Sequence, residues 1–97
     1  MLKSTQRAYL RSLSNGVEAI LRIGKEGVTP EFVQSADEAL EARELIKIGV
    51  LENAPAETGE AAETVAGRTR SEVVLVIGRK FVLYRRARLK PVIELPK

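Results

Sequence analysis

Residues 17–31, VEAILRIGKEGVTPE, indicate the fold class most clearly, because they join a strand, a glycine turn and a helix start. Its first half alternates apolar side chains with Glu18 and Arg22, the period-two pattern of a half-buried strand. The turn GKEG follows, and Thr29 and Pro30 then combine a preferred capping residue with a proline at the first helical position. A strand that leads directly into a helix indicates a sheet with helices packed on it.

The rest of the chain extends this pattern into the order α-β-α-β-α-β-β. We expect Ser4 to cap the first helix, and Asn53-Ala54-Pro55 to open a weaker third helix. The continuously apolar residues 73–77 predict a central strand that is buried on both faces. The expected elements are helices over about residues 4–14, 30–43 and 53–69, strands over 17–23, 46–50, 73–77 and 81–85, and a further short edge strand at 92–95.

These elements predict an α/β fold of the two-layer α+β kind, with a four-stranded mixed sheet packed by helices. The 97 residues suffice for one domain, which we place over residues 1–97. Without His or Cys, the chain has no zinc finger, disulfide framework, thiol nucleophile or Ser-His-Asp triad. No apolar stretch approaches the roughly 20 residues that span a bilayer, and the N-terminus is too polar for a signal peptide. We therefore expect a cytoplasmic binding module without cofactor, metal, catalytic residue, membrane contact or small-molecule substrate.

Charge is distributed unevenly along the chain. Residues 1–25 carry a net +4, residues 26–63 carry −8 and residues 64–97 carry +7, which leaves the +3 of the whole chain. Such asymmetry between segments indicates a polyanionic partner. We expect the fold to bring the two basic ends together on one sheet-and-loop surface.

The first candidate site is the loop Gly24-Lys25-Glu26-Gly27. Its glycines let the backbone approach a ligand, and the start of the following helix favours an anion. The loop lacks the Gly-Lys-Ser/Thr ending of a Walker loop and the third glycine of a dinucleotide fingerprint. The alternative is a plain strand-to-helix turn, which spacing alone favours.

The second candidate site is a cluster of bases over residues 68–90. Arg79 and Lys80 are expected at a hairpin tip, where long cations reach a phosphate backbone. Tyr84 is a candidate surface on which an unpaired base stacks, although a packing role suits so scarce an aromatic somewhat better. Arg85 ends the same strand. The alternative for the whole cluster is a solvated surface that keeps the protein soluble.

Two further groups of charges lie on the expected helices. Lys3, Arg7 and Arg11 recur every four residues and form a basic stripe on the first helix. Asp37, Glu41 and Glu44 lie on the second helix, where they could hold a hard metal for a nuclease. We favour a solvated face for these acids, because the opposite face of the helix supplies the core.

Several motifs in order resemble the YhbY-like CRM domain family, the chloroplast RNA splicing and ribosome maturation domain. They are Ile23-Gly24-Lys25-Glu26-Gly27-Val28-Thr29, Ala39-Leu40-Glu41-Ala42-Arg43-Glu44-Leu45-Ile46-Lys47-Ile48, Val76-Ile77-Gly78 and Val82-Leu83-Tyr84-Arg85. The resemblance covers essentially the whole chain. Glu26 departs from it by placing an acid inside the loop, and residues 53–70 fit it less closely.

The resemblance implies an RNA-binding domain with a Gly-x-x-Gly loop like that of KH domains. It also implies a fold similar to the C-terminal domain of bacterial translation initiation factor three. Stand-alone bacterial members associate with the precursor of the large ribosomal subunit, which makes ribosomal RNA the expected partner and ribosomal proteins further partners. The implied motif residues are Gly24, Lys25, Glu26 and Gly27 of the loop, with Gly78, Tyr84 and Arg85. The alternative is a protein-interaction module that docks on a ribosomal protein or GTPase through its acidic second helix or residues 92–95.

Overall fold

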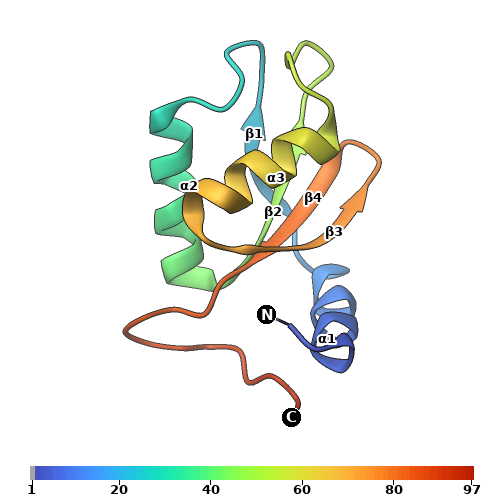
Figure 1. Ribbon diagram of the computed structural model, residues 1–97, viewed down its shortest axis with the longest axis vertical. Coiled ribbons are helices and arrows are strands. Elements are labelled where there is room, and N and C mark those ends of the chain that lie inside the picture. The colour runs from blue at the N-terminus through green and yellow to red at the C-terminus, as the bar shows by residue number, and fades with distance from the viewer. Residues whose placement is uncertain (1) are drawn as a thin grey trace.

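Three helices and four strands follow one another in the predicted order in the computed structural model, which describes residues 2–97. The elements are α1 (Ser4–Ser14), β1 (Ala19–Ile23), α2 (Pro30–Arg43), β2 (Leu45–Val50), α3 (Thr58–Thr69), β3 (Glu72–Ile77) and β4 (Lys80–Tyr84). The strands form one sheet in the order β1-β2-β4-β3 (Figure 1). Because β1 and β2 are parallel and the other pairs antiparallel, the sheet is mixed, and the predicted fold class is confirmed.

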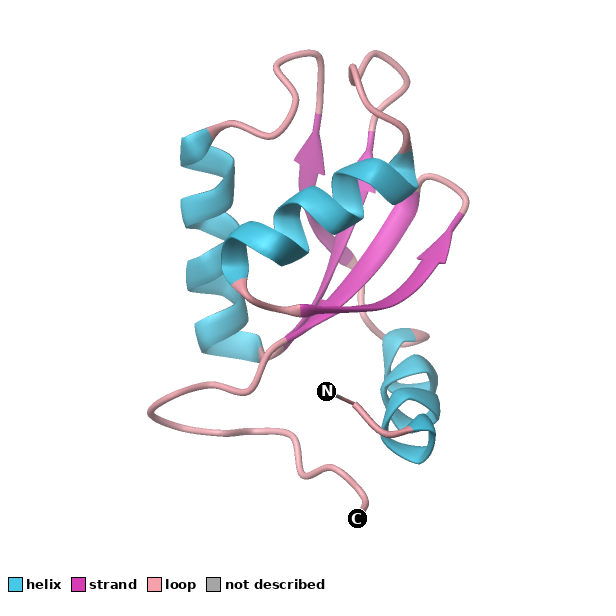
Figure 2. Cartoon of the chain, in the orientation of Figure 1, coloured by secondary structure: helices cyan, strands magenta, loops and turns pink. Residues whose placement is uncertain are grey.

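The two faces of the sheet bury two different sets of apolar side chains. Helices α2 and α3 cover one face, where Ile48, Phe81 and Leu83 meet residues such as Leu40 and Val65 of the helices. Helix α1 lies against the other face and packs Leu10 among Leu45, Val82 and Tyr84 (Figure 2). Alternation along the strands supplies both sets, because successive strand side chains point to opposite faces.

The start of α2 forms as the sequence predicts. Pro30 is the first helical residue, and the Thr29 hydroxyl accepts a hydrogen bond from the Phe32 N–H at 3.0 Å. The cap of α1 is shifted by one residue. Lys3 caps that helix in place of Ser4, and its own N–H donates to the side chain of Gln6 at 3.0 Å.

Strand β3 lies at the edge of the sheet, so the prediction of a central strand is wrong. Strand β4 pairs with both β2 and β3 and takes the inner position. Val76 and Ile77 are 44% and 60% exposed. The run of apolar residues 73–77 has a different cause. The β3–β4 ladder is irregular between Val73 and Leu75, so the strict alternation of faces is interrupted, and Val74 and Leu75 both pack on the α1 side.

Two further boundaries differ from the prediction. Helix α3 begins at Thr58, because residues 51–57 form a loop in which the Ala54 N–H donates to the Leu51 carbonyl at 3.1 Å. Residues 92–95 form no strand. The N–H groups of Val92 and Ile93 donate to the Glu44 carboxylate instead of to a neighbouring strand. Among residues 2–97, no helix is both long and apolar enough to cross a membrane.

Candidate nucleic-acid interface

The Gly24–Gly27 loop follows β1 directly and stands beside the 51–57 loop (Figure 1). The Leu51 N–H donates to the Ile23 carbonyl at 2.9 Å and joins the bases of the two loops. The Gly27 N–H donates to the Gly24 carbonyl at 3.0 Å and closes the turn. The turn therefore rests on the end of the sheet, immediately before the N-terminus of α2.

The two glycines of this loop are required for different reasons. Gly27 has φ +71°, a backbone conformation that favours glycine, and a Cβ there would lie 3.0 Å from the Pro55 Cγ, a tighter contact than most side chains make. Gly24 has no such requirement, because a Cβ there would meet only ordinary contacts, the nearest at 3.6 Å from the Leu51 Cδ1. The fold therefore explains why position 27 is glycine. It does not explain the glycine at position 24, where the missing side chain leaves room for a ligand to approach.

The β3–β4 turn brings further cations to the same end of the sheet. The Arg79 carbonyl accepts from the Val50 N–H at 2.7 Å, and Lys80 pairs with Gly49 in the β2–β4 ladder. The side chains of Lys25, Arg79 and Lys80 are exposed. We call this region, formed by residues 24–27, Arg79 and Lys80, the loop end. It unites residues from two parts of the chain.

The basic stripe of α1 lies away from the loop end, contrary to the expectation of one shared surface. Helix α1 packs near the Leu45–Tyr84 pair, at the opposite end of the strands. Arg7 is also engaged internally, because its Nη1 donates to the Val73 carbonyl at 2.5 Å and its Nη2 lies 3.6 Å from Glu72. Lys3 and Arg11 are exposed at this second end.

Tyr84 and Arg85 hold the fold together rather than facing solvent. Tyr84 is 5% exposed, which agrees with the packing alternative, and burial raises the pKa of its hydroxyl, with the Glu44 charge adding to the rise. Arg85 donates through Nη1 to Asp37 Oδ1 at 2.5 Å and to the Thr69 carbonyl at 2.9 Å. It thereby ties the end of β4 to both α2 and α3.

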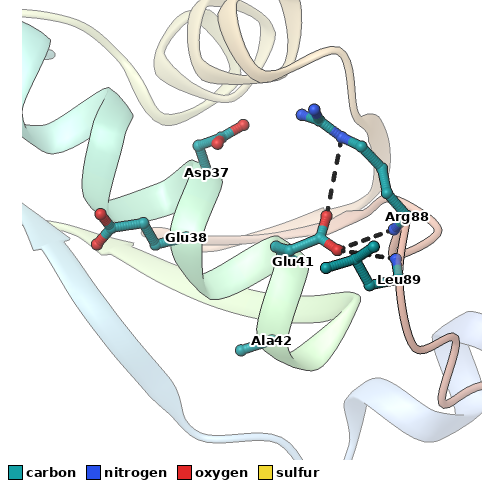
Figure 3. Close-up of a pocket in the computed structure, with 6 residues that line it drawn as sticks. All are labelled: Asp37, Glu38, Glu41, Ala42, Arg88 and Leu89. Atoms are coloured by element: carbon teal, nitrogen blue, oxygen red, sulfur yellow. Dashed lines mark hydrogen bonds and ion pairs between the residues drawn. The ribbon is translucent and has the colours of Figure 1, made fainter.

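The acids of α2 and its cap make contacts within the protein. The prediction of a solvated acidic face is wrong for Glu44, which is buried, whereas the Asp37 and Glu41 side chains remain half-exposed. Besides the Asp37 contact with Arg85, Glu41 Oε2 accepts from the backbone N–H groups of Arg88 and Leu89 at 2.9 and 3.3 Å (Figure 3). Glu41 Oε1 lies 3.9 Å from the Arg88 Nε (Figure 3). Residues 2–97 contain no group of three His, Cys, Asp or Glu side chains placed to hold a metal ion.

Glu44 is completely buried at the C-cap of α2. Its carboxylate accepts the N–H of Ala87 at 2.7 Å, of Val92 at 2.7 Å and of Ile93 at 2.6 Å. Burial alone would raise the pKa of Glu44, but these three donors and Arg86 outweigh it and lower the pKa below its ordinary value. The carboxylate is thus the anchor of the C-terminal segment.

Two bases that the sequence reasoning left out of the site lie on the α1 side of the sheet. Arg22 is exposed on β1, two residues before the loop. Lys47 is half-buried on β2, and its Nζ donates to the Ser14 carbonyl at 3.0 Å, which ties α1 to the sheet. Their alternation with apolar neighbours was the available signal, because it places both side chains on the face opposite Ile23 and Ile48.

A mixed sheet with a Gly-x-x-Gly turn and exposed cations at one end has the features of a small nucleic-acid-binding domain. Residues 2–85 match the CRS1 / YhbY (CRM) domain family, and the chain belongs to this family, as its motifs predicted. It is 40% identical over 96 residues to the "Probable RNA-binding protein YqeI" of Bacillus subtilis strain 168, across 99% of this chain and 100% of that protein. The solution structure of SAV1595 from Staphylococcus aureus, described as a candidate RNA-binding protein, matches with a TM-score of 0.82 at 45% identity, across 99% and 100% of the two chains. The family supports RNA binding, and none of these matches is named as an enzyme.

Proposed function

We propose that this protein binds ribosomal RNA of the precursor large subunit through its loop end and assists assembly of that subunit in the cytoplasm. The observation that carries RNA binding is the placement of Gly24. The fold does not need a glycine there, yet Gly24 directly precedes Lys25 and lies at the same end of the sheet as the exposed Arg79 and Lys80. The family resemblance to stand-alone bacterial members supports the choice of ribosomal RNA.

In this proposal the loop end holds RNA through its phosphates. The bare backbone at Gly24 lets a phosphate come close, and the positive end of the α2 dipole attracts it. Lys25 adds a mobile positive charge, and Arg79 and Lys80 contact neighbouring phosphates. Such contacts carry little sequence information by themselves, so the loop end would position the RNA rather than read its bases.

The double variant Gly24→Asp/Lys25→Ala tests the loop end directly. We expect the affinity for a labelled large-subunit ribosomal RNA fragment to fall by about tenfold or more, because a carboxylate replaces the site of phosphate approach and a phosphate contact is lost. Gly27 stays intact in this variant, since its backbone conformation is part of the fold. Arg68→Ala on the outer surface of α3 is the matched control for loss of one exposed cation. Unchanged affinity in a folded double variant would remove the loop from the site.

Glu26 offers a test in the opposite direction. Its exposed carboxylate lies inside the loop, where it opposes a phosphate. We expect Glu26→Gln to raise the affinity by about twofold to fivefold at low salt, with a smaller gain as salt screens the charge. Fluorescence anisotropy over a salt series measures both effects. A weaker complex for Glu26→Gln would mean that the acid contacts the RNA favourably and that phosphates lie elsewhere.

The choice of RNA is tested by crosslinking in cells. We expect ultraviolet crosslinking of the tagged protein, followed by sequencing of the attached RNA, to enrich precursor large-subunit sequences. The Gly24→Asp/Lys25→Ala variant is the control, and it should give fewer crosslinks at the same RNA positions. Crosslinks spread evenly over both ribosomal subunits would contradict the proposed role while leaving RNA binding intact.

A further inference from the structure

One row of the sheet crosses all four strands next to the loop end. Arg22 of β1 pairs with Gly49 of β2, Gly49 pairs with Lys80 of β4, and Lys80 pairs with Ile77 of β3. We call these four residues the open row. Their sequence neighbours on β1, β2 and β4, such as Phe81, face the α2/α3 core, so the row faces the other side.

The open row is the part of this face that α1 leaves uncovered. Leu10 of α1 packs over Leu45, Val82 and Tyr84, which lie further along the strands. Arg22, Lys80 and Ile77 are exposed. This uncovered strip begins two residues from Gly24, so it continues the surface of the loop end around the end of the sheet.

Gly49 leaves space on the sheet for the side-chain stem of Arg22. A Cβ at this position would lie 3.5 Å from the Arg22 Cγ, so the stem of Arg22 leans over the glycine. Lys80 stands on the other side of Gly49, two strand spacings or about 10 Å from Arg22 along the row. The row thus presents two cations on one face of the sheet, with no carboxylate among its members.

The aromatic residues narrow the kind of partner that this surface fits. Proteins that hold unpaired bases stack them on exposed aromatic rings. The chain has four aromatic residues, and none lies in the row. Phe81 and Tyr84 are buried, Phe32 packs against the α2/α3 core, and Tyr9 is on α1. Cations on a sheet face without aromatic rings suit the sugar-phosphate backbone of paired RNA, which proteins recognise by shape and phosphate contacts.

We propose that the open row is a second RNA contact, which binds the phosphate backbone of a base-paired RNA segment held at the loop end. Arg22 and Lys80 contact phosphates, and Gly49 positions the stem of Arg22. This inference rests on the proposed RNA-binding function and adds both a surface and a class of RNA to it.

The test compares two exposed cations on opposite sides of the sheet. The row variant is Arg22→Gln, which leaves every cation of the loop end in place, and the control is Arg43→Gln on α2, which removes the same charge. The probes are a labelled RNA hairpin with a long paired stem and a labelled oligo-uridine, at physiological ionic strength, where charges act over about 8 Å. We expect hairpin affinity to fall about fivefold in the row variant, with a salt dependence shallower by about one phosphate contact. The control should change by less than about twofold.

A second pair of variants keeps every charge. Gly49→Ala adds only a Cβ in ordinary contact with Arg22, whereas Gly49→Val adds methyl groups where the Arg22 stem lies. Valine suits a strand, so both proteins should fold. We expect hairpin affinity to fall by about threefold for valine and to stay within about twofold for alanine, because only valine displaces the phosphate-binding cation.

The outcomes separate this inference from the proposed function. The open row is not a site if hairpin affinity is unchanged in the row variant or falls equally in the control. In either case the loop-end variant still tests RNA binding independently. Tighter binding of oligo-uridine than of the hairpin overturns the assignment to paired RNA. If the unmodified protein bound neither the hairpin, nor oligo-uridine, nor a ribosomal RNA fragment, this would instead contradict the proposed function.

Discussion

Replacing Glu44 by Ala is expected to lower the free energy of unfolding by about 3–4 kcal/mol, because it removes the acceptor of three backbone N–H groups and each unpaired buried donor costs roughly 1–3 kcal/mol. Release of the C-terminal segment into water limits the loss, since the N–H groups of Ala87, Val92 and Ile93 can then be hydrated. Urea unfolding at neutral pH measures the change. For a domain of this size the loss is a large share of the total stability.

Two other substitutions at position 44 divide this effect into its parts. Glu44→Gln retains one acceptor oxygen for Val92 and Ile93 and should be less destabilising than Glu44→Ala. Glu44 also has φ +67°, a conformation that glycine adopts without strain. We therefore expect Glu44→Gly to be about 1 kcal/mol more stable than Glu44→Ala. Equal stability of all three variants and the original protein would show that the carboxylate does not anchor the segment.

The same carboxylate predicts a defined pH dependence. The pKa of Glu44 is lower in the folded protein than its ordinary value of 4.5, so folding favours the ionised form. Its contribution is complete above the ordinary value and is lost as the pH falls through the lower, folded value. Comparison with Glu44→Gln over an acid pH series isolates this group from the other carboxylates. The stability difference between the two proteins should shrink as the pH falls, and a constant difference would exclude titration of Glu44 as the cause.

Arg85→Met is expected to cost about 2 kcal/mol, the second largest effect on stability. The guanidinium joins Asp37 on α2 to the Thr69 carbonyl at the end of α3, and hydrogen bonds to a charged group contribute about 1.5–3 kcal/mol. Half-exposure of Asp37 moderates the loss, because water can solvate that carboxylate. Arg68→Met, which removes an exposed arginine from α3, should change stability by less than about 0.5 kcal/mol.

RNA affinity then separates the structural role of Arg85 from a role in binding. Arg85→Lys keeps the charge but not the planar fork that serves both helices, so we expect it to restore only part of the stability. Under conditions where both proteins are folded, Arg85→Lys and Arg85→Met should bind RNA within about twofold of the original protein, because the side chain lies inside the fold. A loss comparable to that of Gly24→Asp/Lys25→Ala would place Arg85 in the RNA site instead.

The site was only partly predictable from residue types. The Gly24–Gly27 loop and the hairpin cations Arg79 and Lys80 were identified from local patterns, and the structure places them at one end of the sheet. Tyr84 belongs to the same motif region but lies in the core. Arg22 was missed because a single base in a strand pattern carries no sign of its neighbours across the sheet.

The order and kind of the elements could be predicted from local sequence, because they depend on residues close together in the chain. Alternation defined β1, and Thr29 with Pro30 defined the start of α2, since period and capping are local interactions. The folded arrangement was needed to learn which strand lies at the edge, which end of the sheet α1 covers and which acids are buried. Those outcomes depend on strand pairing and on contacts between residues far apart in the chain, such as that of Glu44 with Ile93. No local pattern encodes such contacts, because they exist only once the chain has folded.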